Sequence, residues 1–263
     1  MSRAGLESAA RSVAEVKQVI STVTEQEASL PSGCVGWSVK DLVAHMSSNF
    51  KEICEPSPPP PEPVTLPAEA LMEMLVEPRK DWSWSQVRDE YLQYCDGAVG
   101  ALAALQDEPM ASTPSALADL GTYPLHQMAD AFAFDHYCHL RIDLLAPTGP
   151  VQRDLPPADD ALAGPAIGWM LLGLPKMQPG LVAHLTAPIT LVLTGAGGGR
   201  WRLVPEGEEI VVTIADGPSA GTVTSTAHDF VMWGTRRHAW RDDCTVSGDQ
   251  AVVAGFLDAL NIV

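Results

Sequence analysis

A helical stripe of apolar residues, interrupted by two polar side chains that are able to bind a metal, constrains this chain most. Met128, Phe132, Asp135, His139 and Ile142 follow one another at steps of four and three residues, the spacing of side chains that share one face of a helix. A carboxylate and an imidazole on a buried face are costly unless a hydrogen bond, an ion pair or a metal ion satisfies them. This segment therefore predicts a helix with a polar site on its inner face.

The same periodicity runs through the first half of the chain and predicts four helices. They cover about residues 5–27, a segment that begins after Ser38, residues 85–106 and residues 124–145. Ser38 and Asp41 form a start of the capping-box type for the second helix. The run 56–67 contains seven prolines and reads as an extended crossing. Four helices with one long crossover are typical of a bundle, where metal sites form on inward-facing residues.

The composition changes after Ala146, and residues 147–158 include four prolines, as an interdomain linker would. We therefore expect a first domain over residues 1–148 and a second over residues 149–263. Strand-like segments in the second domain cover residues 189–193, 200–204, 210–214, 222–226 and 244–247. Helical segments cover residues 161–177, 227–235 and 249–261. This order predicts an α+β domain with a mostly antiparallel sheet.

Charge and cysteine content exclude several classes of function. The net charge of -17 argues against nucleic acid and against an anionic membrane surface as partners, because both call for basic patches. The longest apolar run, residues 161–174, is too short and too glycine-rich to span a bilayer. Five cysteines form no paired framework, and no signal peptide opens the sequence, so we expect reduced thiols and a cytoplasmic location.

Asp135 and His139 are the first candidate metal ligands. At positions i and i+4 they lie about 6 Å apart on one helix face, close enough to share one cation. His45, at the edge of the apolar face of the second helix, would complete a set of two histidines and one carboxylate. Such a set leaves positions open for water or substrate, as in catalytic zinc and non-haem iron sites. The alternative is a buried Asp135–His139 hydrogen bond without a metal, with His45 as a structural residue.

Two further residues of the same helix leave alternatives open. His136 lies three residues before His139 and could replace Asp135 as a ligand. Asp143 follows His139 by four residues and could orient its second ring nitrogen, as carboxylates behind metal-bound histidines do. A solvated residue at the helix end is the alternative for Asp143.

A basic cluster stands out in the acidic second domain. Arg236, Arg237, His238 and Arg241 could attract a substrate that carries a carboxylate. The alternative is surface ion pairing with the neighbouring acidic residues 242 and 243. The glycine-rich run 195–199 lacks the Lys-Ser/Thr of a phosphate-binding loop and opens a strand, so it does not indicate nucleotide binding.

Several sequence phrases resemble one known family. The run Trp37–His45 (WSVKDLVAH) resembles the second helix of the DinB-like bundle in the mycothiol-dependent maleylpyruvate isomerase family. Asp135-x-x-x-His139, followed by Asp143, resembles the acidic-x-x-x-His motif on that family's fourth helix. Residues 221–230 and 246–249 are similar to its sterol-carrier-like C-terminal domain. The resemblance covers nearly the whole chain.

The resemblance implies a divalent metal, usually zinc, held by the residues that match the family's ligands, His45, Asp135 and His139. It also implies a low-molecular-weight thiol such as mycothiol as cosubstrate, bound to the metal as a thiolate of lowered pKa. In the family's isomerase reaction the thiolate adds to a cis double bond conjugated to a carbonyl. Rotation and elimination then give the trans isomer.

Two departures from the family pattern limit what can be carried over. The acidic ligand is typically Glu in the family, whereas this chain has Asp135. The segment Trp233–Arg237 only approximates the family's Gly-Arg ending, so maleylpyruvate itself is not the expected substrate. The leading hypothesis is a metal-dependent, thiol-using isomerase or S-transferase that acts on a small, carboxylate-bearing electrophile. The alternatives are a non-catalytic small-ligand-binding protein with a degenerate metal site, and a metal-dependent hydrolase.

Overall fold

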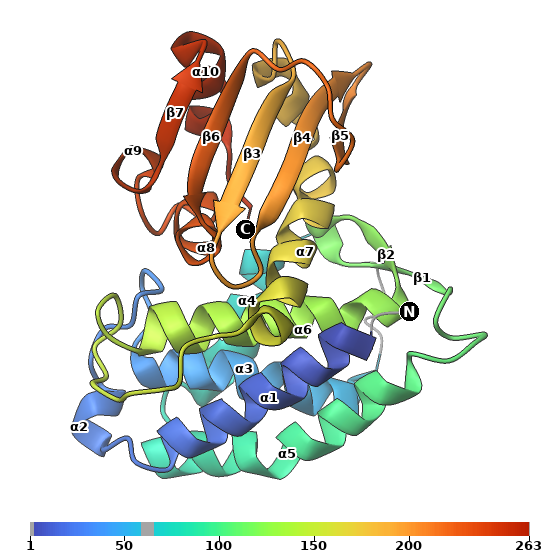
Figure 1. Cartoon of the computed structure of the whole chain (residues 1–263). Helices are drawn as coiled ribbons and strands as arrows, with labels where there is room; N and C mark the ends of the chain where they lie inside the picture. Colours follow the sequence, from blue (N-terminus) through green and yellow to red (C-terminus); the bar gives the residue numbers. More distant parts are fainter. Residues whose placement is uncertain (1–2, 59–65, 263) are drawn as a thin grey trace. The chain divides into compact units, whose positions relative to one another are not determined.

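The computed structural model describes residues 3–58 and 66–262, and the chain divides into two units (Figure 1). We call Met1–Pro157 the helical unit and Ala158–Val263 the α+β unit. The predicted boundary lay after residue 148, but the segment 149–157 packs with the helical unit. Val151 is fully buried in that unit's core, and Arg153 forms an ion pair with Glu27 at 2.9 Å.

Four long helices build the helical unit and confirm the predicted bundle. They are α1 (Arg3–Ile20), α3 (Val39–Cys54), α5 (Trp84–Ala104) and α6 (Met128–Cys138). Helix α3 packs against α5, and α1 packs against α6. The shorter elements are α2 (Glu25–Ala28), α4 (Ala68–Val76), η1 (Glu77–Arg79), β1 (Pro114–Ala116), η2 (Ala118–Leu120), β2 (Thr122–Pro124) and η3 (Leu125–Gln127).

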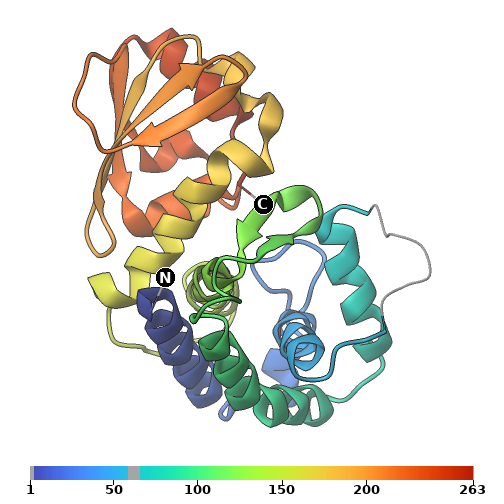
Figure 2. The same ribbon diagram turned by 90° about the vertical axis from the view of Figure 1, so that its right-hand side faces the viewer.

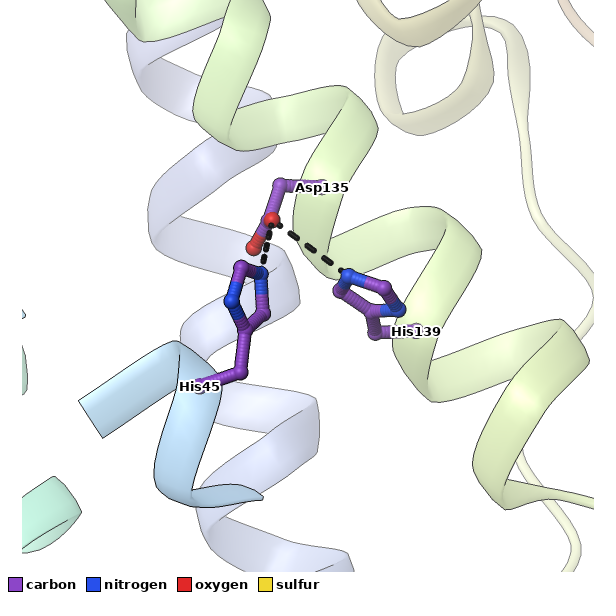
Figure 3. A group of neighbouring side chains, drawn as sticks. All are labelled: His45, Asp135 and His139. Atoms are coloured by element: carbon purple, nitrogen blue, oxygen red, sulfur yellow. Dashed lines mark hydrogen bonds and ion pairs between the residues drawn. The ribbon is translucent and has the colours of Figure 1, made fainter. Parts of the chain in front are cut away.

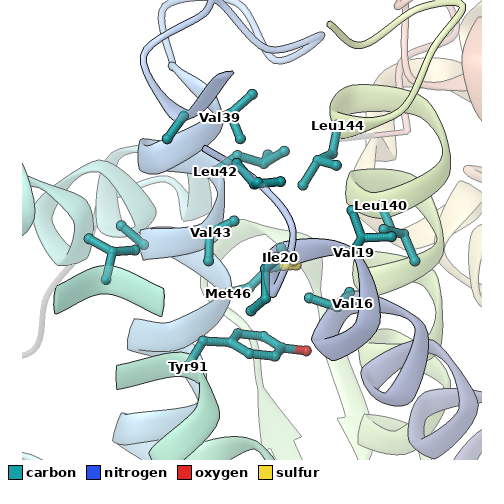
Figure 4. Close-up of a cluster of buried hydrophobic side chains, with 14 of the residues drawn as sticks. Val16, Val19, Ile20, Val39, Leu42, Val43, Met46, Tyr91, Leu140 and Leu144 are labelled. Atoms are coloured by element: carbon teal, nitrogen blue, oxygen red, sulfur yellow. The ribbon is translucent and has the colours of Figure 1, made fainter. Parts of the chain in front are cut away.

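The apolar stripes of the helices meet in one core. Figure 4 shows side chains of α1, α3 and α5 together with Leu140 and Leu144, which follow α6. The start of α3 is fixed by a capping box, in which Ser38 Oγ accepts from the Asp41 amide and the Asp41 side chain accepts from the Ser38 amide. This cap sets the start of α3 and thereby the direction of His45, about two turns further along the helix.

The last helix of the bundle changes its winding at the candidate site. After Cys138, α6 continues as a π-helix, η4 (His139–Leu144), and the Leu145 amide donates to the Leu140 carbonyl at 3.1 Å. We predicted one regular helix over residues 124–145. The helical winding ends before Pro147, which has no amide hydrogen and disfavours helical geometry in the residue before it.

Other local features differ from the sequence-based expectation. The predicted helix over residues 5–27 is broken after Ile20, because Thr24 forms a capping box with Glu27 and starts α2 separately. Helix α4 and the hairpin of β1 and β2 were not predicted. Of the predicted extended crossing over residues 56–67, residues 59–65 lie outside the described part of the chain.

The α+β unit contains a five-stranded sheet in the order β5-β4-β3-β6-β7. Its strands are β3 (Ile189–Thr194), β4 (Gly199–Glu206), β5 (Glu209–Thr213), β6 (Gly221–Thr226) and β7 (Thr245–Gly248). All neighbouring pairs are antiparallel except β3 and β6, which are parallel. This confirms the expected mostly antiparallel sheet.

Helices cover one side of this sheet (Figure 2). They are α7 (Asp160–Met177), η5 (Pro179–His184), α8 (Ala227–Gly234), α9 (Trp240–Asp243) and α10 (Gln250–Ala259). The sheet residues Leu191, Leu193 and Val223 are buried, whereas the alternating Val192 and Thr224 are only half-buried. Burial alternates along β6, whereas on β3 Thr190, which points to the other side of the sheet, is buried as well. No helix within the described residues is long and apolar enough to cross a bilayer.

Candidate metal centre

The three predicted ligands converge in the helical unit (Figure 3). His45 Nε2 lies 3.0 Å from Asp135 Oδ1, and His139 Nε2 lies 3.5 Å from the same oxygen. One donor atom from each residue lies within 4.8 Å of the other two. His45 comes from α3, Asp135 from α6 and His139 from the first position of the π-helix. The two imidazole rings stand edge to face, with centroids 4.9 Å apart.

The three side chains are shielded to different degrees. The His45 side chain is 6% exposed, that of His139 is 12% exposed and that of Asp135 is 20% exposed. The cluster therefore lies at the margin of the bundle core, and its outer edge reaches solvent. This location gives a low local dielectric, which strengthens charge interactions.

Asp143 supports His139 from behind. Its Oδ2 accepts from His139 Nδ1 at 2.8 Å, and its side chain is fully buried. The alternative of a solvated residue at the helix end is therefore wrong. Because a carboxylate only accepts hydrogen bonds, His139 carries a proton on Nδ1, and Nε2 is the ring nitrogen that faces Asp135 and is available to a metal.

The loop of residues 29–37 contacts both histidines, one directly and one through Asp143. The Gly33 amide donates to the Asp143 carbonyl at 2.7 Å, and a Cβ at Gly33 would lie 2.8 Å from Asp143 Cα. Only glycine allows this approach of the loop to η4. The Trp37 ring packs on His45, with centroids 5.1 Å apart, and its Nε1 donates to Glu73. Sequence reasoning missed Gly33, because its partner lies far away in the sequence.

His136, the predicted alternate ligand, contacts the other carboxylate oxygen. Its Nδ1 lies 3.0 Å from Asp135 Oδ2, and its side chain is almost fully buried. Its ring stacks on Phe50, with centroids 4.8 Å apart. His136 is thus outside the group of three donor atoms that converge, although it touches the same aspartate.

The charges of the cluster favour an ionised Asp135. Burial alone would raise the pKa of this carboxyl. The imidazoles of His139 and His45, together with hydrogen bonds from His136 and His45, outweigh burial and hold that pKa well below its ordinary value. The carboxylate is the form that binds a cation.

The donor atoms fit a divalent transition metal. Two imidazole nitrogens and one carboxylate oxygen suit zinc or iron and leave positions open. Bonds of about 2 Å place the ligand atoms of a tetrahedral zinc roughly 3.3 Å apart, and the two measured separations lie on either side of this value. In addition, His139 Nε2 lies 3.5 Å from Asp135 Oδ1, and two such acceptor atoms approach each other favourably only with a proton or a cation between them.

The basic cluster of the α+β unit is engaged in structural interactions. Arg236 has a φ of +56° and donates to the carbonyls of Asp258, Ala259 and Leu260, so it caps the end of α10. Arg241 forms an ion pair with Asp258 rather than with the neighbouring acidic residues, because Asp258 lies beside it in space. The assignment of Arg236 and Arg237 to a substrate carboxylate stays a prediction.

Comparisons with known proteins agree with the fold of the chain. A family model, the mycothiol maleylpyruvate isomerase N-terminal domain, matches residues 9–141. Two similar solved structures are crystal structures of the mycothiol-dependent maleylpyruvate isomerase, one of them a histidine-to-alanine variant. Each has 16% sequence identity and a TM-score of 0.60, and the alignment covers 92% of this chain and 91% of the other. At this identity they show the fold alone. No curated protein matches the chain.

Proposed function

This chain belongs to the family defined by the mycothiol maleylpyruvate isomerase N-terminal domain, and from that membership we propose that it is a divalent-metal-dependent enzyme that uses a low-molecular-weight thiol. The reaction is an isomerisation or an S-transfer on a small, carboxylate-bearing electrophile. The observation that carries the proposal is the convergence of His45 Nε2, His139 Nε2 and Asp135 Oδ1 at the margin of the bundle core.

In this proposal each of the three residues has one role. His45 and His139 would hold the ion through Nε2, and Asp135 would supply one negative charge through its carboxylate. When bound, zinc or a similar ion supplies a Lewis acid that favours the thiolate form of the thiol and lowers its pKa. Asp143 keeps the proton of His139 on Nδ1, so that Nε2 stays a donor to the metal.

The surroundings of the three ligands determine access. Trp37 packs on the His45 ring and keeps water from that side. The Asp135 side chain is 20% exposed, and in this proposal the thiol and the electrophile approach the ion from that exposed part. We propose no single substrate, because the aspartate ligand and the Arg236–Arg237 segment both depart from the family's pattern.

A second candidate, a metal-dependent hydrolase, rests on the same donor set. Three protein ligands leave positions that water can take as readily as a thiol, and bound water becomes a nucleophile near neutral pH. The two candidates differ in whether a thiol enters the coordination sphere.

Metal analysis and cobalt substitution test the proposal. We expect about one zinc or cobalt ion per chain in the reconstituted protein, and none in the His45→Ala, His139→Ala double variant. Addition of mycothiol to the cobalt form should produce a sulfur-to-cobalt charge-transfer band. No metal uptake would refute the proposal, and metal uptake with an unchanged spectrum on thiol addition would favour the hydrolase.

A further inference from the structure

The two oxygens of Asp135 have different partners. Oδ1 faces both candidate metal-binding histidines, at 3.0 and 3.5 Å. Oδ2 lies 3.0 Å from Nδ1 of His136, a residue of the same helix that points to the other side of the carboxylate. One oxygen of the carboxylate therefore faces the candidate metal site, and the other faces a third imidazole.

The ring of His136 is held in place by aromatic neighbours from three helices. It stacks on Phe50 of α3 at an interplanar angle of 27°. Tyr91 of α5 lies 6.0 Å away and Phe132 of α6 lies 6.3 Å away, measured between ring centroids. With an exposed fraction of 0% for the residue, the imidazole has no room to swing toward the three donor atoms.

The hydrogen-bonding capacity of the cluster fits one tautomer of His136. A carboxylate oxygen beside Nδ1 requires the proton on Nδ1 and leaves Nε2 as an acceptor. Among the described residues, both ring nitrogens of His136, Asp135 Oδ2 and the Tyr91 hydroxyl are buried without a hydrogen bond of good geometry, so the 3.0 Å approach of Nδ1 to Oδ2 is a close polar contact. Burial raises the pKa of Tyr91 well above its ordinary value, so its hydroxyl keeps its proton and remains a donor.

We propose that His136 is a positioning residue that holds Asp135 Oδ2, so that the carboxylate binds the ion through Oδ1 alone. This inference rests on the proposed metal site. A carboxylate binds a cation through one or both oxygens, and a hydrogen bond to the second oxygen selects the first mode. Binding through one oxygen keeps a coordination position free for the cosubstrate.

The chain offers a graded set of variants to test this role. His136→Phe keeps an aromatic ring in the cluster and removes the donor. His136→Asn keeps an N–H group close to the position of Nδ1. His136→Gln keeps an amide but displaces it by one bond, and it replaces His136→Phe if the phenylalanine variant does not fold. Phe132→Leu is the packing control, because it removes a ring of the same cluster without touching the carboxylate.

The measurements are the zinc dissociation constant, by competition with a chelator, and the d–d absorption of the cobalt form. We expect His136→Phe and His136→Gln to weaken zinc binding about 10- to 100-fold, the usual effect of losing such a supporting group. Their cobalt absorption should also weaken, because intensity falls as a second oxygen raises the coordination number. His136→Asn should restore most of the affinity and the spectrum, and Phe132→Leu should keep both.

Three results would overturn the inference. Wild-type affinity and spectrum in both His136→Phe and His136→Gln would refute it while leaving the metal site intact. Equal losses in His136→Asn and His136→Phe would indicate that His136 is itself a ligand. Absence of metal uptake by the wild-type protein would refute the site and this inference together.

Discussion

The helical unit and the α+β unit differ in what they bury. Among the described residues, all buried side chains with a charge or an imidazole lie in the helical unit, namely His45, Arg79, Glu90, His136 and Asp143. The buried polar side chains of the α+β unit are the hydroxyls of Thr190, Ser225 and Thr235, and each forms a hydrogen bond. Its Arg241–Asp258 ion pair has side chains that are 58% and 50% exposed.

This difference indicates where the chemistry is located. Buried charges and imidazoles cost free energy, and proteins keep them where a function needs them. Buried hydroxyls that bond to nearby groups cost little and serve packing. The buried imidazoles and charges of the described residues therefore make the helical unit the part in which we expect the chemistry.

The largest expected effect is on metal binding, and it compares histidines that contact a carboxylate in the helical unit with one that does so in the α+β unit. Replacement of His45 and His139 by alanine should abolish metal binding, whereas His238→Ala should leave it unchanged, since His238 only pairs with Asp243 at the surface. Metal at a thousandfold excess over its dissociation constant should stabilise the wild type by about 4 kcal/mol. Calorimetry with and without zinc measures this, and an equal zinc-induced shift in the double variant would contradict the site.

The next effect compares a buried and an exposed ion pair. Glu90 accepts from Arg79 at 2.5 and 2.9 Å and from Ser47 at 2.8 Å, with only 7% of its side chain exposed. Glu90→Ala leaves a buried guanidinium without its counter-ion and should destabilise the helical unit by about 3–5 kcal/mol. Hydrogen exchange of the amides of α3 and α5 measures this change.

Asp258→Ala is the matched control for the buried pair. It removes the partner of Arg241 at the surface, where such pairs contribute about 0–1 kcal/mol. A similar loss of stability in both variants would mean that the contrast in burial between the units has no energetic consequence.

A third effect uses the close approach of the loop to η4. A Cβ at Gly33 would lie 2.8 Å from Asp143 Cα and 2.9 Å from Asp143 Oδ1, so the backbone must shift and move the support of His139. Gly33→Ala should weaken zinc binding about 10- to 100-fold, as loss of such support does. Gly164→Ala in α7 makes the same change where no atom lies within 4 Å, and it should leave zinc affinity unchanged. Unaltered affinity in Gly33→Ala would show that the loop does not position Asp143.

The smallest effect is a pH dependence confined to the α+β unit. Hydrogen bonds from Arg241 and Trp240 lower the pKa of Asp258 from 3.8 to about 2. The folded state therefore binds this proton less readily than the unfolded state, and the stabilisation is present above about pH 4 and lost as the pH falls toward 2. Because the pair is exposed, the loss should stay below about 1 kcal/mol. Unfolding of the wild type and Asp258→Asn between pH 5 and 2 should converge at low pH, and a constant difference would contradict this cause.

The sequence pattern within a single segment was enough to predict those structural features that depend on that segment alone. The Ser38–Asp41 capping box fixed the start of α3 and with it the place of His45. The four-residue step from Asp135 to His139 fixed their common helix face. Short runs rich in β-branched and apolar residues, separated by turn residues, located the strands, because these signals need no knowledge of the partner strand.

Features that depend on distant segments were beyond the sequence. The role of His136 depends on rings from α3 and α5, which no pattern in α6 reveals. Gly33 and Asp143 meet only after the bundle has formed. The buried Arg79–Glu90 pair joins η1 to α5, and single charged residues in such segments read as solvated. In each case tertiary packing, rather than local preference, decides the conformation.

The π-helical winding of η4 has a consequence for how this stretch can change in evolution. A π-turn closes on the fifth preceding residue, so it holds one residue more than an α-turn. Deletion of one residue among 140–142 would favour the tighter winding and bring Asp143 from four to three residues after His139, which changes the angle between the two side chains and strains their hydrogen bond. In related sequences we therefore expect substitutions at these positions to be more frequent than deletions. Deletion of one residue here should weaken metal binding as severely as the loss of a ligand.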